Sequence, residues 1–417
     1  MQNHVSVAMT QLGFVINYSK SATTPSQQLT HLGFELDSLT STVNISWQKI
    51  ETVRKLASEL LSHRKHPIRS VAQFIGFVVS CFPGVEYGPL HYRSLENNKS
   101  KALGVARGNF DSFMTLSQEA RDEVVWWKSY AGTYPRQLCH GNADVILQTD
   151  ASLEGWGAKV VNGTSTGGRW SASERFHHIN ELELKAAQLG LQAFCHQMNG
   201  VHIQLQLDNM TAVSYLREMG GSRSQSCNKL ANEIWRWCHA RSLWISATHI
   251  AGTENVIADK ESRVFDDKTE WKLDLKAFTY CIELWGQPEI DMFASRLNFQ
   301  FKPYVSWRPD PGAYAIDAFC LNWCDKYLYL FPPFSLIPRV LKKIQEDKAR
   351  AILIAPQWPT QPWFPLLKKL SISQPLLLPR SKTLLTLPAH PDAVHPLFPK
   401  LRMAAYLLSA RNCDGKT

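Results

Sequence analysis

The sequence predicts an α/β fold in which a five-stranded mixed sheet with flanking helices occupies residues 141–268. A helical region is expected before this sheet, and a smaller α/β or irregular basic region after it. One observation is that the apolar period changes from helical to strand-like near residue 144. Another is that the elements then follow in the order three strands, helix, strand, helices, strand, helix, which is typical of a mixed sheet with helices on its faces. The chain of 417 residues, 44% apolar and 19% charged, suits several globular domains.

The N-terminal part is expected to begin with strands and to continue with helices. Residues 12–36 predict two short strands joined by a turn, LGFVINYSKS and TTPSQQLTHLGFEL, because β-branched and aromatic residues are bounded by Ser, Thr and Pro. Apolar residues at helical spacing predict helices at 48–62, 69–82 and 116–130. We therefore expect residues 40–135 to be all-helical.

From residue 144 onward, the sequence predicts five strands and four helices. The strands are DVILQTD, GWGAKVV, the segment through Arg169-Trp170, HIQLQLD and LWISATHI, and the helices are NELELKAAQLGLQAF, TAVSYLREM, KLANEIWRWCHA and VIADKESR. Beyond them, IDMFASR (290–296), FPPF (331–334) and ILIAPQWP (352–359) alternate with helix-like stretches and suggest another α/β unit.

The net charge of +9 is concentrated at the end of the chain. Residues 335–417 carry thirteen Lys/Arg against four Asp/Glu, together with many prolines. Such a segment fits either a polyanion partner, because clustered cations release counterions from nucleic acid, or a solubilising linker.

The cysteine pattern favours a chain that is not secreted and lies in the cytoplasm or nucleus. Nine cysteines are scattered without a CxxC pair, which suits free thiols. Cys320 and Cys324 could share a helix face, but no second ligand pair for zinc lies nearby. No secretory pattern and no apolar run of about 20 residues is found, so no membrane span is expected.

Four acidic residues lie where predicted strands end or helices begin: Asp150, Glu183, Asp208 and Asp259. A lone Asp at a strand end is usually a turn former or a helix cap. Several carboxylates gathered in one place repel one another unless divalent cations lie between them, and oxygen ligands suit Mg²⁺ or Mn²⁺. Two such ions could generate the attacking hydroxide and stabilise the leaving oxygen of a phosphodiester.

Glu181 and Glu183 compete for the helical position in this set. Glu181 belongs to a polar stripe and can pair with Lys185, so its face of the helix is expected to be solvated. Glu183 lies instead one turn from a stripe of small residues, Ala186, Ala187 and Gly190, that suits close packing on a sheet. A buried carboxylate there requires compensation by a cation, so we favour Glu183.

Four further polar residues are candidates for the same site. His249 lies ten residues before Asp259 in a Gly-containing loop, where it could shuttle protons or be an ordinary surface histidine. Asn209 and Asn255 could contact the substrate backbone or cap helices, and a cap is the plainer interpretation for Asn255. Ser152 lies two residues after Asp150 and is a further candidate substrate-binding residue.

The motifs TDAS (149–152), ELKA (183–186), LDN (207–209) and H-x9-D from His249 to Asp259 together resemble a retroelement ribonuclease H domain. The resemblance covers roughly 141–265. It implies a five-stranded mixed sheet, endonucleolytic cleavage of the RNA strand of RNA–DNA hybrids, and two Mg²⁺ ions. It also implies Asp150, Glu183, Asp208 and Asp259 as metal ligands, with His249 as the loop histidine.

The flanking segments resemble parts of a reverse transcriptase. LGFVINYSKS and HLGFEL look like its last palm strands and primer grip (1–38), and the helices of 39–140 look like its thumb and connection. Ribonuclease H-like residues 141–268 would follow, and then a C-terminal region 269–417 of uncertain fold that is basic and Pro-rich after residue 335. Phrases such as GVEYGPLHYR and IDMFASRLN resemble the C-terminal part of a DIRS-type retrotransposon polyprotein, of the tyrosine-recombinase class.

Several activities are not expected of this chain. The polymerase motif, an aromatic residue, any residue and then Asp-Asp, is absent, so we expect no polymerase activity without a missing upstream half. FPPF faintly resembles the DPPY motif of adenine methyltransferases, but Phe331 replaces the polar first residue. No recombinase Arg/His/Tyr set is apparent. The alternative to a nuclease is a non-catalytic nucleic-acid-binding remnant of a retroelement.

Overall fold

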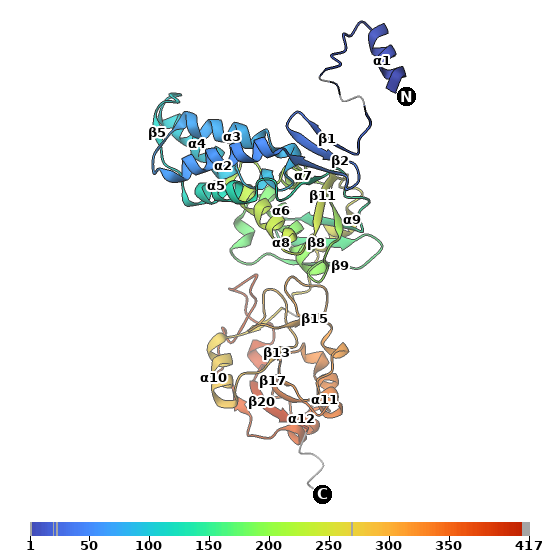
Figure 1. The fold of residues 1–417 in the computed structure, drawn as a ribbon. Coiled ribbons are helices and arrows are strands. Elements are labelled where there is room, and N and C mark those ends of the chain that lie inside the picture. The colour runs from blue at the N-terminus through green and yellow to red at the C-terminus, as the bar shows by residue number, and fades with distance from the viewer. Residues whose placement is uncertain (1, 20, 22–23, 268–269, 411–417) are drawn as a thin grey trace. The chain divides into compact units, whose positions relative to one another are not determined.

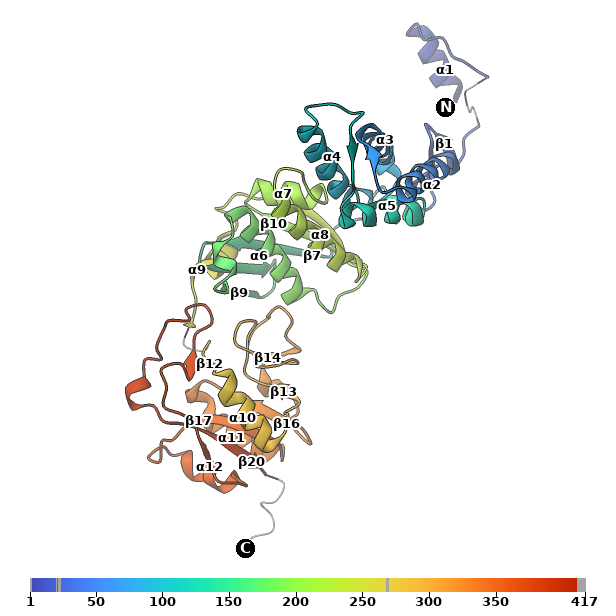
Figure 2. The same cartoon turned by 90° about the vertical axis from the view of Figure 1, so that its left-hand side faces the viewer.

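The structure is a computed structural model that describes residues 2–19, 21, 24–267 and 270–410. The chain divides into two compact units, one of residues 1–141 with 218–228 and one of residues 142–217 with 229–417. Figures 1 and 2 show the helices and strands of each unit. Within the described ranges, no helix is long and apolar enough to cross a bilayer.

The first unit begins with a helix, α1 (Gln2–Gln11). The sequence predicted two strands directly after it, within residues 12–36. The strand predicted for LGFVINYSKS is wrong: the described residues between 12 and 21 form no strand, and Val15 is 98% exposed. The second predicted strand is in fact a hairpin of β1 (Gln28–His31) and β2 (Phe34–Asp37). Its turn, Leu32-Gly33, has positive φ at both residues, as a two-residue hairpin requires.

Four helices form most of the rest of this unit: α2 (Trp47–Ser62), α3 (Ile68–Val79), α4 (Arg93–Val105) and α5 (Gln118–Tyr130). Three were predicted. The fourth, α4, was missed because Leu95 is its single buried apolar residue, so apolar periodicity is weak. The buried Glu123 carboxylate on α5 holds the start of α4, accepting hydrogen bonds from the backbone of Ser94 and Leu95 at 2.9 Å each.

The expectation that residues 40–135 are all-helical is wrong. Short strands interrupt the helices: β3 (Thr42–Ile45), β4 (His66–Pro67) and β5 (Phe113–Met114), and β6 (Arg136–Gln137) follows. Two-residue strands carry no readable alternation in sequence, because their pairing is set by the partner strand.

The predicted five-stranded mixed sheet is confirmed in the second unit. It consists of β7 (Val145–Ala151), β8 (Gly155–Val160), β9 (Ser165–Arg169), β10 (His202–Leu207) and β11 (Trp244–His249). The order is β11-β10-β7-β8-β9, in which β11, β10 and β7 are parallel while β7, β8 and β9 are antiparallel. The carboxyl ends of β7 and β10 therefore lie at one edge of the sheet.

Helices cover this sheet as predicted. They are α6 (Ile179–Phe194), α7 (Met210–Arg217), α8 (Gln225–His239) and α9 (Val256–Arg263). A Cβ at Gly190 of α6 would lie 3.0 Å from the side chains of Ala158 and Thr149, so the small-residue stripe packs closely on the sheet. Helix α9 packs on the opposite face, over Gly157, because neighbouring residues of a strand point to opposite sides.

The C-terminal part, residues 270–410, is an α/β unit with its own sheet, as the sequence suggested. The sheet has the order β13-β16-β17-β20-β18. Its strands are β13 (Ile290–Asp291), β16 (Tyr327–Leu330), β17 (Arg350–Pro356), β18 (Leu376–Leu377) and β20 (Met403–Ser409). Its helices are α10 (Leu275–Trp285), α11 (Ile337–Glu346) and α12 (Phe364–Leu370). Two small pairs join β12 (Lys272–Leu273) to β19 (Leu385–Thr386) and β14 (Val305–Ser306) to β15 (Ala315–Ile316).

Both faces of this sheet are buried. Alternate residues of β17 and β20 pack against α11 and α12 on one face, for example Leu353 and Leu408. The other residues of these strands pack on the opposite face. There they contact α10 and Leu384, Leu385 and Leu401 of the Pro-rich segment that joins α12 to β20 (residues 371–402), called the Pro-rich tail below. The tail is thus part of a packed core, and the solubilising-linker interpretation is wrong for the described residues up to 410. The region is also not irregular.

Asp291, at the end of β13, is a buried acid in this core. Its Oδ2 accepts a hydrogen bond from the backbone of Gln300 at 2.9 Å, while Oδ1 lacks a partner among the described residues. Burial raises the pKa of Asp291 from 3.8 to about 7, although the backbone bonds from Gln300 and Phe293 and the charge of Lys272 oppose the shift.

We expect the free energy of unfolding of this α/β unit, the C-terminal lobe (residues 270–410), to fall as pH rises from about 4 to about 7. The reason is that Asp291 loses its proton at a lower pH in the unfolded chain than in the folded one. Asp291→Asn should flatten that dependence, since the amide stays neutral and still accepts from Gln300. Calorimetric unfolding across this pH range measures it, with Asp392→Asn, an exposed acid, as control. Equal pH profiles for wild type and Asp291→Asn would contradict the expectation.

Candidate active site

Three carboxylates gather at the edge of the five-stranded sheet. Asp150 lies in β7, Glu183 in α6 and Asp208 directly after β10, and one oxygen of each lies within 4.8 Å of the others. Within the described ranges, they form the one set of three or more His, Cys, Asp or Glu residues able to share a metal ion. An all-carboxylate set suits hard divalent cations such as Mg²⁺ or Mn²⁺.

Burial makes this arrangement costly without a cation. Burial and then the negative charges of Asp150 and Asp208 raise the pKa of Glu183 to about 9. Burial also raises the pKa of Asp150, an effect that the hydrogen bond from Ser262 opposes. Glu183 Oε2 is buried with no hydrogen-bond partner among the described residues. A divalent cation would fit a buried carboxylate oxygen that has no hydrogen-bond donor and belongs to a cluster of three acids.

Asp259, the fourth acid of the predicted set, lies outside the group of three. It is on α9, and its Oδ1 accepts a hydrogen bond from Arg263 Nε, one turn further along, at 2.7 Å. Its charge nevertheless contributes to the raised pKa of Asp150, so the two carboxylates are near one another.

Hydrogen bonds fasten α9 to β7. Asn255 Nδ2 donates to the Thr149 carbonyl at 2.9 Å, and Ser262 Oγ contacts Asp150 Oδ2 at 2.6 Å. Ser152 Oγ donates to the Ser262 carbonyl at 2.6 Å. Ser152 and Asn255 are both buried, so two of the three side chains predicted to bind substrate instead hold the helix in place in this structure. Asn255 also occupies the N-cap position of α9, without a side-chain capping bond.

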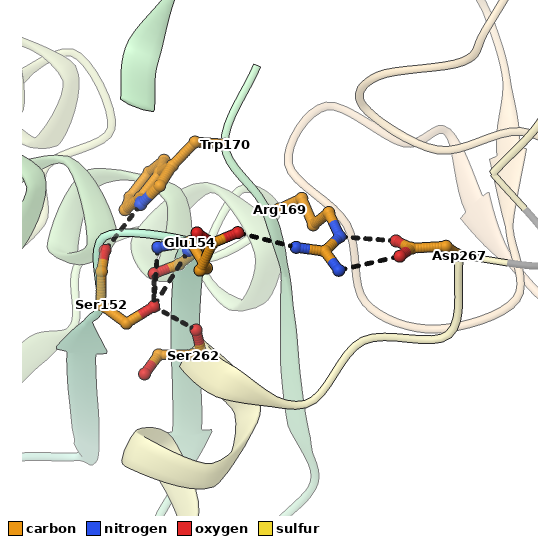
Figure 3. Close-up of polar contacts among 7 residues, drawn as sticks. Ser152, Glu154, Arg169, Trp170, Ser262 and Asp267 are labelled. Atoms are coloured by element: carbon orange, nitrogen blue, oxygen red, sulfur yellow. Dashed lines mark hydrogen bonds and ion pairs between the residues drawn. The ribbon is translucent and has the colours of Figure 1, made fainter. Parts of the chain in front are cut away.

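A second fastening lies beyond the end of α9. Arg169, at the end of β9, makes a two-pronged ion pair with Asp267 at 2.6 and 2.8 Å and a third bond to Glu154 at 3.1 Å (Figure 3). The buried Trp170 beside it donates its indole N–H to the Ser152 carbonyl at 2.9 Å (Figure 3). Asp267, four residues after the end of α9, therefore ties the chain after this helix back to the sheet.

Glycines in β8 and β9 let α9 approach the sheet. A Cβ at Gly157 would collide with the Ala258 carbonyl and lie 2.7 Å from the Ser262 backbone nitrogen. A Cβ at Gly167 would lie 2.6 Å from the Glu261 carbonyl. The close approach brings Ser262 within hydrogen-bonding distance of Asp150.

His249 and Asn209 lie beside Asp208. His249 ends β11, is exposed, and has its Nε2 3.1 Å from the Asp208 carbonyl oxygen. Asn209 Oδ1 accepts from the Ala212 backbone at 3.0 Å and so caps α7, while its Nδ2 donates to Asn180 at 3.0 Å. Both side chains are near an acid of the cluster and remain candidates for contact with substrate.

The neighbouring acid, Glu181, is correctly left out of the cluster but has a different partner than predicted. Its Oε2 lies 2.7 Å from His177 Nδ1, and Lys185 instead bonds Gln188 at 2.9 Å. Sequence reasoning also missed Ser262 and Arg263. Their positions three and four residues after Asp259 place all three on one helix face, which is the signal that could have found them.

The sheet order, the helices that cover the sheet, and the acids on β7, on α6 and directly after β10 define a ribonuclease H-like fold. No family model matches the chain. It is 29% identical over 132 residues to the "Enzymatic polyprotein" of Carnation etched ring virus, which covers 28% of this chain and 18% of the polyprotein. The chain thus spans less than a fifth of that relative's length.

Similar solved structures include ribonuclease H1 of Halobacterium salinarum, at 19% identity and a TM-score of 0.23, covering 28% of this chain and 91% of that one. Another is the foamy viral protease-reverse transcriptase in complex with an RNA/DNA hybrid, at 11% identity and a TM-score of 0.27, covering 60% and 33% respectively. A third is LC11-RNase H1 with an RNA/DNA hybrid, at 16% identity and a TM-score of 0.22, covering 28% and 92%.

We expect Gly157→Ala to destabilise the contact between α9 and the sheet by about 1–3 kcal/mol, because the new methyl group overpacks backbone atoms. Hydrogen–deuterium exchange of the α9 amides measures this directly. Gly104→Ala is the matched control, since a Cβ at this helical glycine meets nothing within 4 Å. Unchanged α9 protection in Gly157→Ala would show that the sheet yields more easily than the structure indicates.

If Asp150 binds metal, we expect Ser262→Ala to weaken Mg²⁺ or Mn²⁺ binding by about ten- to a hundredfold, because the hydrogen bond that holds this carboxylate is lost. Titration calorimetry with each ion measures the dissociation constant. Ser129→Ala, on the exposed side of α5, serves as control. Equal affinities for the Ser262 variant and wild type would mean that the hydroxyl does not orient Asp150.

Proposed function

We propose that residues 142–267 form a divalent-metal-dependent endonuclease that hydrolyses the RNA strand of RNA–DNA hybrids within a retroelement polyprotein. The observation that carries the proposal is the convergence of Asp150, Glu183 and Asp208 from three separated elements. Similarity to a viral enzymatic polyprotein over 132 residues supports the retroelement setting. A DIRS-type origin, the division at 1–38, 39–140, 141–268 and 269–417, and an upstream polymerase half remain predictions from the sequence.

The acids would hold two Mg²⁺ ions, or Mn²⁺, with Asp259 as the fourth ligand. Bound ions supply an activated water and stabilise the leaving oxygen of a phosphodiester, so no covalent bond to the protein forms. Arg263 competes with a metal for Asp259, because its guanidinium already binds one carboxylate oxygen. Ser262 donates a hydrogen bond to Asp150 Oδ2 and so would hold this carboxylate in place when a metal ion binds.

His249 suits proton movement at the rim of the site. It is exposed to solvent, and its Nε2 lies 3.1 Å from the Asp208 carbonyl oxygen. A nearby glycine keeps the loop close: a Cβ at Gly252 would lie 3.3 Å from Asp208 Oδ2. We assign to His249 the transfer of a proton at the leaving group, and to Asn209 a contact with the substrate backbone.

Asp150→Asn tests the nuclease directly. We expect it to lower cleavage of the RNA strand of a labelled hybrid by at least about a hundredfold, because one of the carboxylates proposed to bind metal loses its negative charge. The DNA strand should stay intact, since only RNA offers the 2′-hydroxyl. The control is Asp392→Asn, which changes an exposed acid of the C-terminal lobe.

Unchanged Mg²⁺-dependent cleavage by Asp150→Asn would refute the assignment. The second candidate is a non-catalytic nucleic-acid-binding remnant, and the ion pair of Asp259 with Arg263 favours it, because one predicted ligand is engaged elsewhere. Salt-dependent hybrid binding by wild type with no cleavage in Mg²⁺ or in Mn²⁺ would select that alternative.

A further inference from the structure

Two segments of the Pro-rich tail lie side by side on the C-terminal lobe and enclose a small basic hollow. The backbone of Leu378 donates to the Met403 carbonyl at 3.0 Å, and Arg380 Nη2 donates to the Pro399 carbonyl at 3.0 Å. The lining includes Arg380, Lys382 and Arg402, and contains no carboxylate. Residues about twenty apart in the sequence therefore bring their cations to one place.

These cations are exposed and free of acidic partners. Arg380, Lys382, Arg402 and the neighbouring Lys400 are all exposed, and none of them forms an ion pair within the described part of the chain. Asp392 is the one acid in the sequence from 371 to 410. Four positive charges against one negative charge leave a local field that an anion would neutralise.

Buried apolar side chains support the basic hollow from below. Leu378, Leu384, Leu385 and Leu401 beneath it are buried against the sheet in the same apolar cluster as β17 and β20. Arg380 is further restrained by its bond to Pro399 and lies over the Phe398 ring at 5.9 Å. Because the backbone carrying these side chains is already ordered, binding a ligand there requires little additional ordering.

The size of the hollow limits its ligand. Its volume of about 20 Å³ is close to the space for a single water molecule, so neither a nucleobase nor an amino-acid side chain fits inside. Exposed Arg and Lys around such a rim suit phosphate oxygens, which the planar guanidinium binds through two N–H groups. Contact of this kind reads no base sequence.

We propose that Arg380, Lys382, Lys400 and Arg402 form a second nucleic-acid contact, which binds the phosphodiester backbone independently of sequence. The choice of nucleic acid among polyanions rests on the proposed nuclease function. The surface itself rests only on the geometry and charge of the C-terminal lobe. It is a binding surface for the duplex and takes no part in cleavage.

The test replaces all four residues with Gln and measures binding of a fluorescent RNA–DNA hybrid by anisotropy. Metal is removed with a chelator, so no strand is cut during the titration. We expect the dissociation constant to rise at least about tenfold at moderate salt. The slope of log affinity against log salt should lessen by about 3.6, since each of the four lost phosphate contacts contributes about 0.9.

The matched control carries the same charge change elsewhere on the lobe. Arg339, Arg350, Lys368 and Lys369 are exposed residues of α11, β17 and α12, and all four are replaced with Gln. A second variant, Arg380→Lys with Arg402→Lys, keeps the charge of the hollow and should retain most of the affinity. Equal weakening by the control variant would overturn the proposal, because it would show a general effect of net charge.

Other anions provide the remaining outcomes. Anionic phospholipid vesicles and polyglutamate are titrated in parallel with wild type and with the fourfold Gln variant. Loss of either interaction while hybrid binding is unchanged would assign the surface to a membrane or to an acidic protein and overturn the proposal. Loss of hybrid binding with the same circular dichroism spectrum and unfolding temperature as wild type supports it.

Cleavage is measured separately on the same variants, so the two proposals fail independently. If wild type binds the hybrid through these residues but never cuts it, the surface stands and the nuclease assignment fails. If wild type cuts the hybrid and the fourfold Gln variant binds it as tightly as wild type does, the nuclease stands and the surface fails.

Discussion

Mutual repulsion among Asp150, Glu183 and Asp208 is the constraint on which the arrangement of this site depends. Three carboxylates with oxygens within 4.8 Å of one another, two of them buried, are unfavourable when all are ionised. Only protons or a cation relieves the repulsion, and a pKa of about 9 for Glu183 expresses the first solution. The acids that would bind metal therefore oppose the packing that brings them together, and the surrounding structure must hold them.

Helix α9 supplies much of that restraint. Its residues contact β7 through Asn255 and Ser262, and the chain after it is tied to β9 by the ion pair of Asp267 with Arg169. The glycines of β8 and β9 matter for the same reason, since side chains there would lift the helix away from Asp150. Residues outside the acidic cluster thus determine where Asp150 lies.

In the C-terminal lobe, the amino-acid composition of the Pro-rich tail does not predict how the tail packs. Proline and basic residues suggest an extended linker, yet the leucines between them cover one face of a sheet. Because both faces of that sheet are buried, the cations of the tail are displayed on a rigid surface. Composition alone describes the charge of this segment and not where those charges meet.

The sequence by itself determined the strands and helices of residues 144–263, because long elements repeat their apolar residues with a clear period, as in NELELKAAQLGLQAF. It also singled out Glu183 over Glu181 from the small residues one turn away. Only the tertiary structure decided the short strands of the first unit, the lack of a strand among the described residues of LGFVINYSKS, and the role of Ser152 and Asn255 in holding α9 against β7. It alone joined the two basic segments of the tail. The physical reason is that periodicity reports which face of an element is buried, whereas partners distant in the sequence are set by how those faces pack.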